Sequence, residues 1–515
     1  MGTRMESGGR LQSLLEEFEK LRERLEVLER ENRILREENA LLKRGLFGRG
    51  TERIDPSQLA LYETGQAAIP EPAAPAEAAP RKDKRGHGRA PFAADLPREV
   101  IELDLSEDER SCQHCGKGLR RIGEEITERG HIVPARVVVR RYVRPKYACP
   151  DGHAVKTAAL PDGVIDGGKY EASVYAHVVA SKYSNHLPLH RLEGMLKRRG
   201  VHLPKQTMWD MLSRVDELVA QPVLAQMRRE LLAEPVLHSD ETPVTVCLED
   251  GKGSRTGYAW NWRSLRGRGP PKALVEFRTS RSRDGPLAFL GDWSGTLIID
   301  AYSGFDKVVA RNDIVRAGCW AHARRKLKDA LDTGSTSAAW VLAPVQRLFA
   351  LERAMTQRAE RKGWSFEELV ELRRAVRARR SRDLVAVIHD RAFQLASQRS
   401  TLPKSALGKA LRYLERQREP LATFLDDPRL PIHNNDSERD LRHVAVGRKN
   451  WVVFASPRGG EVACRLYSLV LSCRQSGVDP EAYIEAVLGA ISTTPASQIA
   501  TLTPWGWAAR TPATR

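Results

Sequence analysis

The segment PVLHSDETPVTV, residues 235–246, predicts a β-strand that carries an abrupt acidic pair, Asp240 and Glu241. Two further segments, TGYAWNWRSL (256–265) and KALVEFRT (272–279), alternate apolar and polar residues as half-buried strands do. Together the three segments predict a three-stranded meander.

Two more predicted strands and a helix extend this meander into an α/β domain. GTLIID (295–300) ends at Asp300, while IVRAGCW (314–320) leads into the basic helix AHARRKLKDAL, which contains Arg324 and Arg325. Five strands with helices, with one acid inside a strand and a second at the end of another, are typical of an RNase H-like fold. Such a fold requires a third acid from a later helix.

The third acid is expected to be Glu438, in the segment IHNNDSERDLRHVAVGRKNW (432–451). Asn435 or Asp436 can cap the predicted helix, which leaves Glu438 in its first turns and facing inward.

The three acids Asp240, Asp300 and Glu438 have the chemistry of a divalent-metal site. Hard Mg²⁺ or Mn²⁺ ions prefer carboxylate oxygens, and three carboxylates leave coordination positions open for water and phosphate oxygens. Two ions about 3.5–4 Å apart would activate the attacking oxygen and stabilise the leaving oxygen of an in-line displacement. Because the same site can use water first and then the freed 3′-hydroxyl, the triad predicts both strand cleavage and strand transfer.

Each member of the triad also has an ordinary structural interpretation. The two aspartates can be turn residues at strand ends, and Glu438 can form a surface pair with Arg442. Glu241 would point to the opposite face of a regular strand, and Asp436 would lie about 200° around the helix from Glu438. These two acids are the alternative members of the triad.

The composition indicates a basic protein of several domains. The chain has 515 residues, so three or more units are expected. Its 83 Lys and Arg outnumber 66 Asp and Glu, and the net charge of +17 favours nucleic acid or an anionic membrane surface as partner. No run of about 18 apolar residues could span a bilayer, and no secretory signal is evident, so a cytoplasmic protein without membrane contact is expected. The seven cysteines suggest reduced thiols and a metal site rather than disulfides.

Residues 11–46 are predicted to form a leucine-zipper coiled coil. Leucines recur every seventh residue, at positions 14, 21, 28, 35 and 42. Asn32 and Asn39 occupy the other seam position, where they pair best with their own copies in a parallel dimer. A homodimer, or a higher oligomer built from it, is therefore expected.

Residues 49–96 are predicted to be a flexible linker, rich in Ala, Pro and Glu. The basic run RKDKRGHGR (81–89) can follow a phosphate backbone or enter a minor groove, and it can equally be a solvated part of the linker. Its candidate DNA contacts are Arg81, Lys82, Lys84, Arg85 and Arg89.

Residues 97–165 carry the spacing of a zinc ribbon. Two close pairs of soft ligands suit tetrahedral zinc, and the segment between them alternates apolar and basic residues like paired strands. Because four protein ligands leave no position for substrate, this Zn²⁺ is expected to be structural. Free buried thiols are the alternative, and His114 or His131 can replace His153 as a ligand. The expected ligands are Cys112, Cys115, Cys149 and His153.

Residues 166–232 have helical periodicity that breaks at 185–188 and at 200–204. The second break resembles a helix-turn-helix corner, in which Gly200 makes the turn and the next helix meets base edges. Packing of these helices against the catalytic domain is an equally open interpretation. The residues that would meet DNA are Lys205, Gln206 and Thr207.

The catalytic domain is expected in two parts, 233–328 and 431–492, separated by a helical insertion at 329–430 and followed by a C-terminal tail at 493–515. The basic run ELRRAVRARRSR (371–382) in the insertion can follow DNA, but a solvated helix face is favoured. Basic residues near the acids are candidate phosphate contacts, with simple surface exposure as the alternative. They are Arg324, Arg325, Arg442, Arg448 and Lys449.

As a whole, the chain resembles the insertion sequence 66 family of bacterial transposases. The resemblance rests on HSDETPV, GCWAHARRKL, NNDSERDLR followed by VGRKNWVVFAS, and YSNHLPLHR, and it extends from the zipper to TPWGW. It implies a DDE transposase with a zinc-binding segment, an RNase H-like catalytic domain and a helical insertion, in which Asp240, Asp300 and Glu438 match the family's acidic triad. It also implies accessory proteins encoded by the same element.

Two cysteine-containing segments bear on this resemblance. Cys319 and His322 resemble a Cys-x2-His signature near the active site of several DDE families, and a structural hydrogen bond is favoured over metal binding. Family members usually carry a second Cys-x2-Cys where this chain has Cys149 and His153, so zinc binding here depends on the histidine.

The sequence therefore predicts a cytoplasmic, nucleoid-associated bacterial transposase that binds double-stranded DNA at the element ends and at the target. Catalysis is expected to need Mg²⁺ or Mn²⁺. Two alternatives stay open: a DNA-binding regulator whose acids are inactive, and an RNase H-like nuclease that does not join strands.

Overall fold

The computed structural model describes residues 22–24, 26–40, 99–100, 137–148, 155–161, 163–164, 168–248, 253–311 and 313–510. The chain divides into two compact units. The smaller unit contains β1 (Lys146–Ala148) and β2 (Val155–Thr157), which pair antiparallel. Both strands lie in or next to the segment for which paired strands were predicted.

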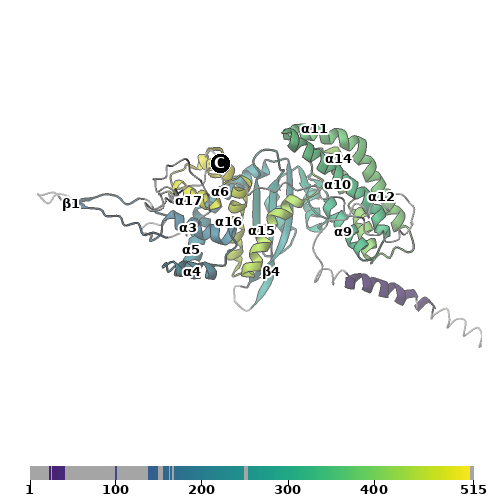
Figure 1. Ribbon diagram of the computed structural model, residues 1–515, viewed down its shortest axis with the longest axis horizontal. Helices are drawn as coiled ribbons and strands as arrows, with labels where there is room; N and C mark the ends of the chain where they lie inside the picture. The colour runs from purple at the N-terminus through teal and green to yellow at the C-terminus, as the bar shows by residue number, and fades with distance from the viewer. Residues whose placement is uncertain are drawn as a thin grey trace, which may run out of the picture. The chain divides into compact units, whose positions relative to one another are not determined.

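The larger unit is built on one mixed sheet of six strands (Figure 1). The strand order is β5-β4-β3-β6-β7, and β8 pairs with β3 beyond the end of β6. Strands β3, β4 and β5 are antiparallel neighbours, whereas β6 and β8 run parallel to β3 and β7 runs parallel to β6. The predicted meander and the fourth and fifth strands are confirmed. Their bounds are β3 Val236–Cys247, β4 Ser254–Ser264, β5 Ala273–Arg278, β6 Thr296–Ile298, β7 Val315–Ala317 and β8 Val453–Phe454.

The segment WNWR of β4 divides the sheet into an aromatic face and a polar face. Trp260 and Trp262 are fully buried on one face, where the Trp262 ring stacks on Phe289 with 4.3 Å between ring centroids. Asn261 and Arg263 alternate with them and are buried on the other face. A buried amide and a buried guanidinium need polar partners, which a helix on that face supplies.

The helices that precede the sheet begin and end where the sequence predicted breaks. Gly200, between α4 and α5, has a φ of +79°, a left-handed conformation that glycine adopts without strain. Short π-helical segments lengthen α3 and α5. The bounds are α3 Ala172–Val179, η2 Ala180–Ser184, α4 Leu189–Arg198, α5 Lys205–Val215, η3 Asp216–Ala220 and α6 Gln221–Leu232.

A group of helices lies between β7 and the segment that carries Glu438. Its apolar side chains form one core with residues of the sheet, including Val236, Ile298 and Ala317. Short helices also connect β5 to β7. The bounds are α7 Asp284–Leu290, η4 Ser303–Phe305, α8 Asp306–Arg311, α9 Trp320–Asp332, α10 Ser337–Lys362, α11 Phe366–Val376, η5 Arg377–Ser381, α12 Arg382–Ala396, α13 Ala406–Arg416 and α14 Arg418–Asp426.

The basic run 371–382 has an exposed side and a buried side. Its exposed arginines, which fit the predicted solvated helix face, are Arg374, Arg379, Arg380 and Arg382. Arg373 and Arg377 are buried, and the guanidinium of Arg377 donates two hydrogen bonds of 2.8 Å to the carboxylate of Glu352. Arg377 also donates to the backbone oxygens of Phe424 and Leu430. These two side chains therefore join helices within the protein, and neither a DNA contact nor a solvated face describes them.

Two of the C-terminal helices, α15 and α16, pack against the sheet. Helix α15 lies against β3 and β4 (Figure 1), while α16 packs against β5. The hydroxyl of Ser468 accepts a 2.7 Å hydrogen bond from the backbone nitrogen of Val275, and Ser472 donates to the oxygen of Ala273, so α16 protects the edge strand β5. The bounds are α15 Asn435–Trp451, α16 Pro457–Gln475, α17 Pro480–Ala490, η6 Ala496–Leu502 and α18 Pro504–Arg510.

The part of the zipper segment that the structure describes, 22–24 and 26–40, is helical. Its seam leucines Leu28 and Leu35 are 55% and 57% exposed, and Asn32 and Asn39 are exposed as well. Among the described residues, no helix is long and apolar enough to cross a membrane.

Candidate active site

Asp240 lies on β3, and Asp300 lies at the matching position just beyond the end of the neighbouring parallel strand β6. The last paired residues of β3 and β6 are His238 and Ile298, and each aspartate follows its strand's pair by two residues. Pairing on this side of β3 resumes at Thr245, with β8. The gap between β6 and β8 leaves one edge of β3 open at Asp240, and the chain leaving β6 brings Asp300 to it.

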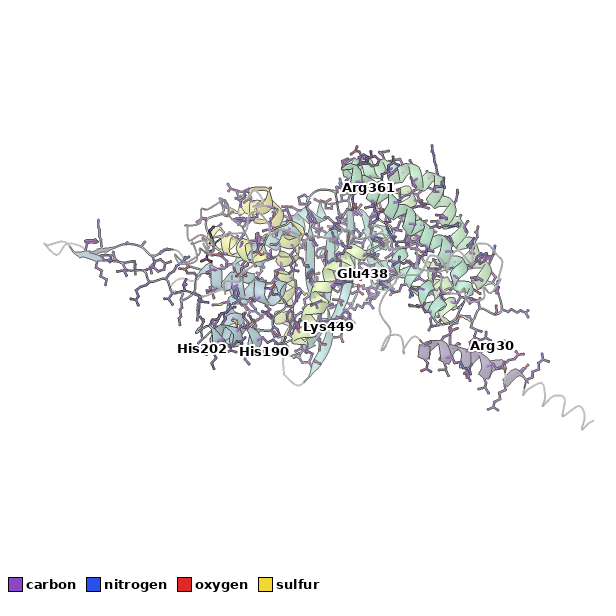
Figure 2. The ribbon with its side chains drawn as sticks, viewed as in Figure 1. Arg30, His190, His202, Arg361, Glu438 and Lys449 are labelled. Atoms are coloured by element: carbon purple, nitrogen blue, oxygen red, sulfur yellow. The ribbon has the colours of Figure 1, made fainter. Side chains whose placement is uncertain are left out.

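Glu438 comes to the same place from α15, which lies on the polar face of the sheet. Asp240 pairs with Asn261 across β3 and β4, so both side chains point toward α15. Figure 2 labels Glu438 and Lys449 on α15, near its start and near its end. The prediction that Glu438 lies in the first turns of this helix is confirmed.

The predicted cap of α15 was wrong. The residue at the N-cap is Asn434, and neither Asn435 nor Asp436 precedes the helix. The Asn434 side chain makes no capping bond, because its nitrogen donates to the backbone oxygen of Ser239 at 2.7 Å and its oxygen accepts from His238 Nδ1 at 2.9 Å. Burial and the charge of Arg263 lower the pKa of His238 to about 4, so its ring is neutral and can donate. Asn434 thereby ties the start of α15 to β3, beside Asp240.

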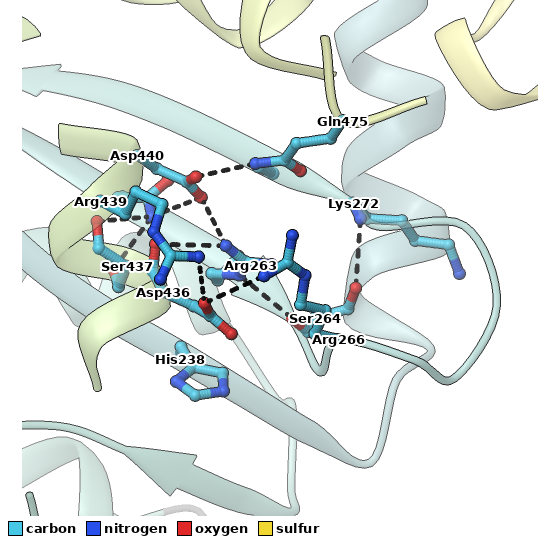
Figure 3. Close-up of polar contacts among 12 residues, drawn as sticks. His238, Arg263, Ser264, Arg266, Lys272, Asp436, Ser437, Arg439, Asp440 and Gln475 are labelled. Carbon is cyan, nitrogen blue, oxygen red and sulfur yellow. Dashed lines mark hydrogen bonds and ion pairs between the residues drawn. The ribbon is translucent and has the colours of Figure 1, made fainter. Parts of the chain in front are cut away.

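A buried network of side chains, which we call the α15 clamp, fixes the next turn of the helix (Figure 3). It consists of Asn261, Arg263, Ser437, Asp440 and Gln475. Arg263 donates to Asp440 at 3.0 Å, and the second carboxylate oxygen of Asp440 accepts from Gln475 at 2.8 Å. Asn261 donates to the Ser437 hydroxyl at 2.9 Å. These bonds set the rotation of α15 about its axis, and Glu438 is the residue directly after Ser437.

The charges of three other carboxylates act on Asp240. Burial, followed by the charges of Glu241, Asp300 and Glu438, raises the pKa of Asp240 to about 8. Its Oδ1 accepts a 2.9 Å hydrogen bond from the backbone nitrogen of Glu241, which opposes this shift only in part. The three predicted acids therefore lie near enough to one another for the charges of Asp300 and Glu438 to act on Asp240.

Glu241 faces away from α15. It pairs with Trp260 across the sheet, and its carboxylate accepts a 2.7 Å hydrogen bond from Arg281 Nε. Burial and the charge of Asp300 raise the pKa of Glu241, against the effect of Arg281. The sequence-based expectation that Glu241 points to the opposite face is confirmed. The other alternative acid, Asp436, is held by Arg439 at 3.1 Å and lies near Arg263 rather than among the three acids.

Two basic side chains of α9 approach Glu438. His322 Nε2 lies 3.8 Å from Glu438 Oε1, and Arg325 lies 3.4 Å from Oε2. Burial lowers the pKa of His322, although the charges of Glu438 and Asp300 oppose the shift, so the imidazole is neutral at neutral pH and can accept a proton. Cys319 is fully buried, and its sulfur accepts a 3.2 Å hydrogen bond from the backbone nitrogen of Asn434. The structural hydrogen bond expected for this Cys-x2-His segment is therefore present at the cysteine.

The acids leave acceptor atoms that a cation would satisfy. Glu438 Oε1 is buried and has no hydrogen-bond partner among the described residues, and the same holds for Glu241 Oε2 on the opposite face of β3. Repulsion among the carboxylates, which raises the pKa of Asp240, is also what a divalent cation between them would relieve. Within the described part of the chain, no three His, Cys, Asp or Glu side chains are grouped so that they could hold one ion together. The donor set therefore fits ions that take one or two protein carboxylates and complete their coordination with water and phosphate.

The candidate DNA contacts on α15 differ in their surroundings. Arg442 and Lys449 are exposed and lie on the same side of the helix as Glu438, with Lys449 about 16 Å along the axis. Arg448 faces β3, where its guanidinium donates to Thr242 Oγ1 at 3.0 Å and to the backbone oxygen of Pro243. On α9, the guanidinium of Arg324 lies 4.5 Å from the ring centroid of Phe349.

The remaining predicted contacts divide between described and undescribed residues. Helix α5 begins at Lys205, directly after the predicted break at 200–204, with Lys205 and Gln206 exposed and Thr207 half-buried. The residues that lie outside the described part of the chain are the basic run Arg81, Lys82, Lys84, Arg85 and Arg89 and the expected zinc ligands Cys112, Cys115, Cys149 and His153.

Sequence reasoning missed the α15 clamp and Arg281. The signal for the clamp was present in WNWR, since a strand that alternates Trp with Asn and Arg must bury polar groups on its second face. Arg281 lies in the connection between β5 and α7, and its sequence SRSRD carries no periodicity that would mark it.

Family models match four stretches of the chain. Residues 167–462 match the model described as "Transposase IS66 family", and 468–505 match "IS66 C-terminal element". Residues 109–151 match "zinc-finger binding domain of transposase IS66", a match that ends before His153. Residues 34–101 match "Transposase C of IS166 homeodomain".

Relatives of similar length come from Sinorhizobium fredii. The chain is 32% identical to the protein y4jD over 493 residues, which cover 91% of this chain and 93% of the relative. It is 30% identical to y4hP over 499 residues, which cover 90% of this chain and 87% of the relative. Both relatives are described as uncharacterized proteins.

Proposed function

The chain belongs to the IS66 family of transposases, and from this premise we propose that it cuts DNA at the ends of its mobile element and joins the freed ends to target DNA. Asp240, Asp300 and Glu438 are the catalytic residues of this proposal. The observation that carries it is their convergence: two acids at matching positions of parallel strands, and a third from a helix fixed on the same face.

The order and direction of the strands support an RNase H-like catalytic domain. The chain forms three antiparallel strands and then two parallel ones, in the order β5-β4-β3-β6-β7. We take this arrangement as support for the RNase H-like fold. Along the chain, helices α10 to α14 come between β7 and α15. This order supports an insertion into the catalytic domain at 329–430.

Asp240, Asp300 and Glu438 would hold the Mg²⁺ or Mn²⁺ ions of the reaction, because carboxylate oxygens are the ligands that these ions prefer. When bound, such ions supply charge stabilisation for the attacking and leaving oxygens of a phosphodiester. The α15 clamp and Asn434 keep Glu438 turned toward Asp240. His322, neutral and beside Glu438, can accept a proton at Nε2, and Arg325 places a positive charge where a phosphate would approach.

The reaction has two exchanges at phosphorus. In the first, water forms a bond to phosphorus and the bond to the 3′-oxygen breaks, which leaves a 3′-hydroxyl at the element end. In the second, that hydroxyl attacks a phosphodiester of the target, and one target 3′-oxygen leaves. Each exchange breaks one phosphorus–oxygen bond for the one that it forms, so neither needs an external energy source.

The rest of the chain would bind and arrange the DNA. The net charge of +17 supports a nucleic-acid partner, and the two exposed cations of α15 and the start of α5 are the proposed contacts on the larger unit. The exposed leucines of the N-terminal helix support pairing with a second copy, which would bring two catalytic domains to two element ends. The zinc-finger match supports a structural Zn²⁺ held by Cys112, Cys115 and Cys149, with His153 as the proposed fourth ligand.

The proposal is tested by nicking of DNA that carries the repeats flanking the chain's own coding sequence. Asp240→Asn, Asp300→Asn and Glu438→Gln should each reduce Mg²⁺-dependent nicking at least 10³-fold while DNA binding persists, because the loss falls on charge stabilisation of the reacting phosphate. Asp292→Asn, an exposed aspartate between α7 and β6, is the matched control and should nick as the wild type does. Full activity of any of the three variants would remove that residue from the proposed triad.

The DNA-binding and nicking assays, together with an assay of strand joining, also distinguish two other functions. A DNA-binding regulator would bind the ends but give no nicking with the wild-type chain. A nuclease without joining activity would nick the ends, yet it would give no joined product when pre-nicked ends and target DNA are supplied together.

A further inference from the structure

A second polar site lies on the face of β3 opposite α15, at Arg281. This residue is in the connection between β5 and α7, and its side chain is 43% exposed. Three separate contacts hold it: an ion pair with Glu241, stacking on the ring of Tyr302, and a hydrogen bond from the Tyr302 hydroxyl to the Arg281 backbone oxygen. A half-exposed arginine in an irregular segment would ordinarily be mobile, so such support calls for an explanation.

The buried carboxylate of Glu241 holds the guanidinium of Arg281 in place. Its side chain is only 4% exposed, and one carboxylate oxygen accepts from both Nε and Nη2 of Arg281. Because both bonds use one edge of the planar guanidinium, the direction of the group is fixed as well as its position.

Tyr302 connects this site to the proposed catalytic acids. The Arg281 guanidinium carbon lies 3.9 Å from the centroid of the Tyr302 ring. The backbone nitrogen of Tyr302 donates a 2.9 Å hydrogen bond to Asp300 Oδ1, and the backbone nitrogen of Glu241 donates to Asp240 Oδ1. The two residues that hold Arg281 are therefore the same two whose backbone groups bond to Asp240 and Asp300.

The acidic surroundings mean that a cation at this position would favour the binding of DNA. Four carboxylates, those of Asp240, Glu241, Asp300 and Glu438, act on one small region and repel the phosphates of an approaching strand. Arg325 offsets this repulsion beside Glu438, on the side of α15. Arg281 offsets it beside Asp300, on the other side of β3.

We propose that Arg281, oriented by Glu241 and Tyr302, binds a backbone phosphate of the cleaved DNA strand next to the phosphate that reacts. This inference rests on the proposed function, since it takes the three acids as the place of cleavage. Arg281 would act with Arg325 so that the strand is held on both sides of the acids. Its role is to position the strand, and Glu241 and Tyr302 act through it.

The test is a binding experiment that needs no cleavage. Duplex DNA ending in the cut terminal repeat is prepared with single uncharged methylphosphonate linkages, one position at a time, and its affinity for the full chain is measured in EDTA. For the wild type, one position near the cut should weaken binding about 10-fold, as expected for loss of one charge-assisted contact. With Arg281→Gln, unmodified DNA should bind about 10-fold more weakly, and the modified linkage should have no further effect.

Two further measurements separate a DNA contact from internal neutralisation of Glu241. Arg281→Gln should make the dependence of log affinity on log salt shallower by about 0.9, the value for one lost phosphate contact. If Arg281 only neutralises Glu241, then Glu241→Gln with Arg281→Gln should restore wild-type affinity, an outcome that would overturn the proposal. If it contacts DNA, the double variant should stay weak.

Two conservative variants test whether weaker DNA binding comes from the lost contact or from misfolding. Arg281→Lys keeps the charge beside Glu241, so it should retain the wild-type salt dependence while losing part of the affinity that the fork and the stacking provide. Tyr302→Phe keeps the ring and should bind more tightly than Tyr302→Ala. Equal sensitivity of the wild type and Arg281→Gln to every modified linkage would refute the proposal. Absence of nicking by the wild type would instead refute the proposed function, since nicking plays no part in the binding result.

Discussion

Replacing Asp240 by asparagine is expected to stabilise the metal-free protein at alkaline pH. The folded protein raises the pKa of Asp240 from 3.8 to about 8, by burial and by the charges of Glu241, Asp300 and Glu438. An acid whose pKa is raised on folding contributes stability that is fully present below the unfolded pKa and is lost as the pH rises through the folded pKa. The wild type should therefore lose stability between about pH 4 and pH 8, and an uncharged amide at this position should not.

The size of the effect follows from the shift. About 4 pKa units at about 1.4 kcal/mol each set an upper bound of about 6 kcal/mol. Because Asp240 is only half-buried and water screens the charges around it, we expect a smaller effect. Above pH 8, Asp240→Asn should raise the free energy of unfolding by about 2–3 kcal/mol. Near pH 3 the aspartate is largely neutral in the unfolded chain as well as in the folded chain, and the difference should nearly vanish.

The assay is thermal unfolding of the wild type and Asp240→Asn in EDTA at a series of pH values, followed by the same series with Mg²⁺. Without metal, the variant should melt progressively higher than the wild type as the pH rises from 4 to 8, and the difference should then be constant. With Mg²⁺, the wild type should gain stability that the variant lacks, because ligand binding to the folded state stabilises it. A difference that does not depend on pH, or a variant that melts lower at pH 9, would refute the convergence of charges on Asp240.

Three further predictions concern other parts of the chain. Leu21→Pro with Leu28→Pro should lower the mass measured by sedimentation, since proline breaks the zipper helix; an unchanged mass would place the assembly contacts elsewhere. Cys112→Ser and His153→Ala should each lower the content of about one Zn²⁺ per chain, and unchanged zinc in the histidine variant would point to His114 or His131. Asp440→Ala should cost about 3–5 kcal/mol in unfolding experiments, because it removes the carboxylate that accepts a hydrogen bond from the buried Arg263; a loss below 1 kcal/mol would show that the α15 clamp is not buried in solution.

The strands and the acids could be predicted because local patterns mark them. Alternation identifies β3, β4 and β5, and an aspartate that interrupts or follows an apolar run is visible in one dimension. The match in position between Asp240 and Asp300 was not predictable, because it depends on the pairing of His238 with Ile298 across 59 intervening residues. Register between distant strands is set by packing and is not encoded in either strand alone.

Other failures have equally specific causes. The sequence does not identify Asn434 as the N-cap of α15, because its side chain bonds to β3 and not to its own helix. That contact depends on the tertiary structure. The charge of the run 371–382 predicts a solvated helix face, which holds for its exposed arginines but not for Arg373 and Arg377. The spacing carries the signal for the buried side, since Arg373, Arg377 and Ser381 recur every fourth residue.

The α15 clamp explains why a catalytic helix is held by polar rather than apolar contacts. Apolar packing alone is non-directional, and one residue of slippage in α15 turns the helix by about 100°, which would put Arg439 or Ser437 where Glu438 lies. The bonds of Asn261 and Arg263 to Ser437 and Asp440 are satisfied in one rotation only. We therefore expect that Arg263→Met with Asp440→Leu keeps or raises the melting temperature but weakens Mg²⁺ binding and nicking together. Wild-type nicking by this double variant would show that apolar contacts suffice to set the rotation, and the clamp would then be only a way of burying charge.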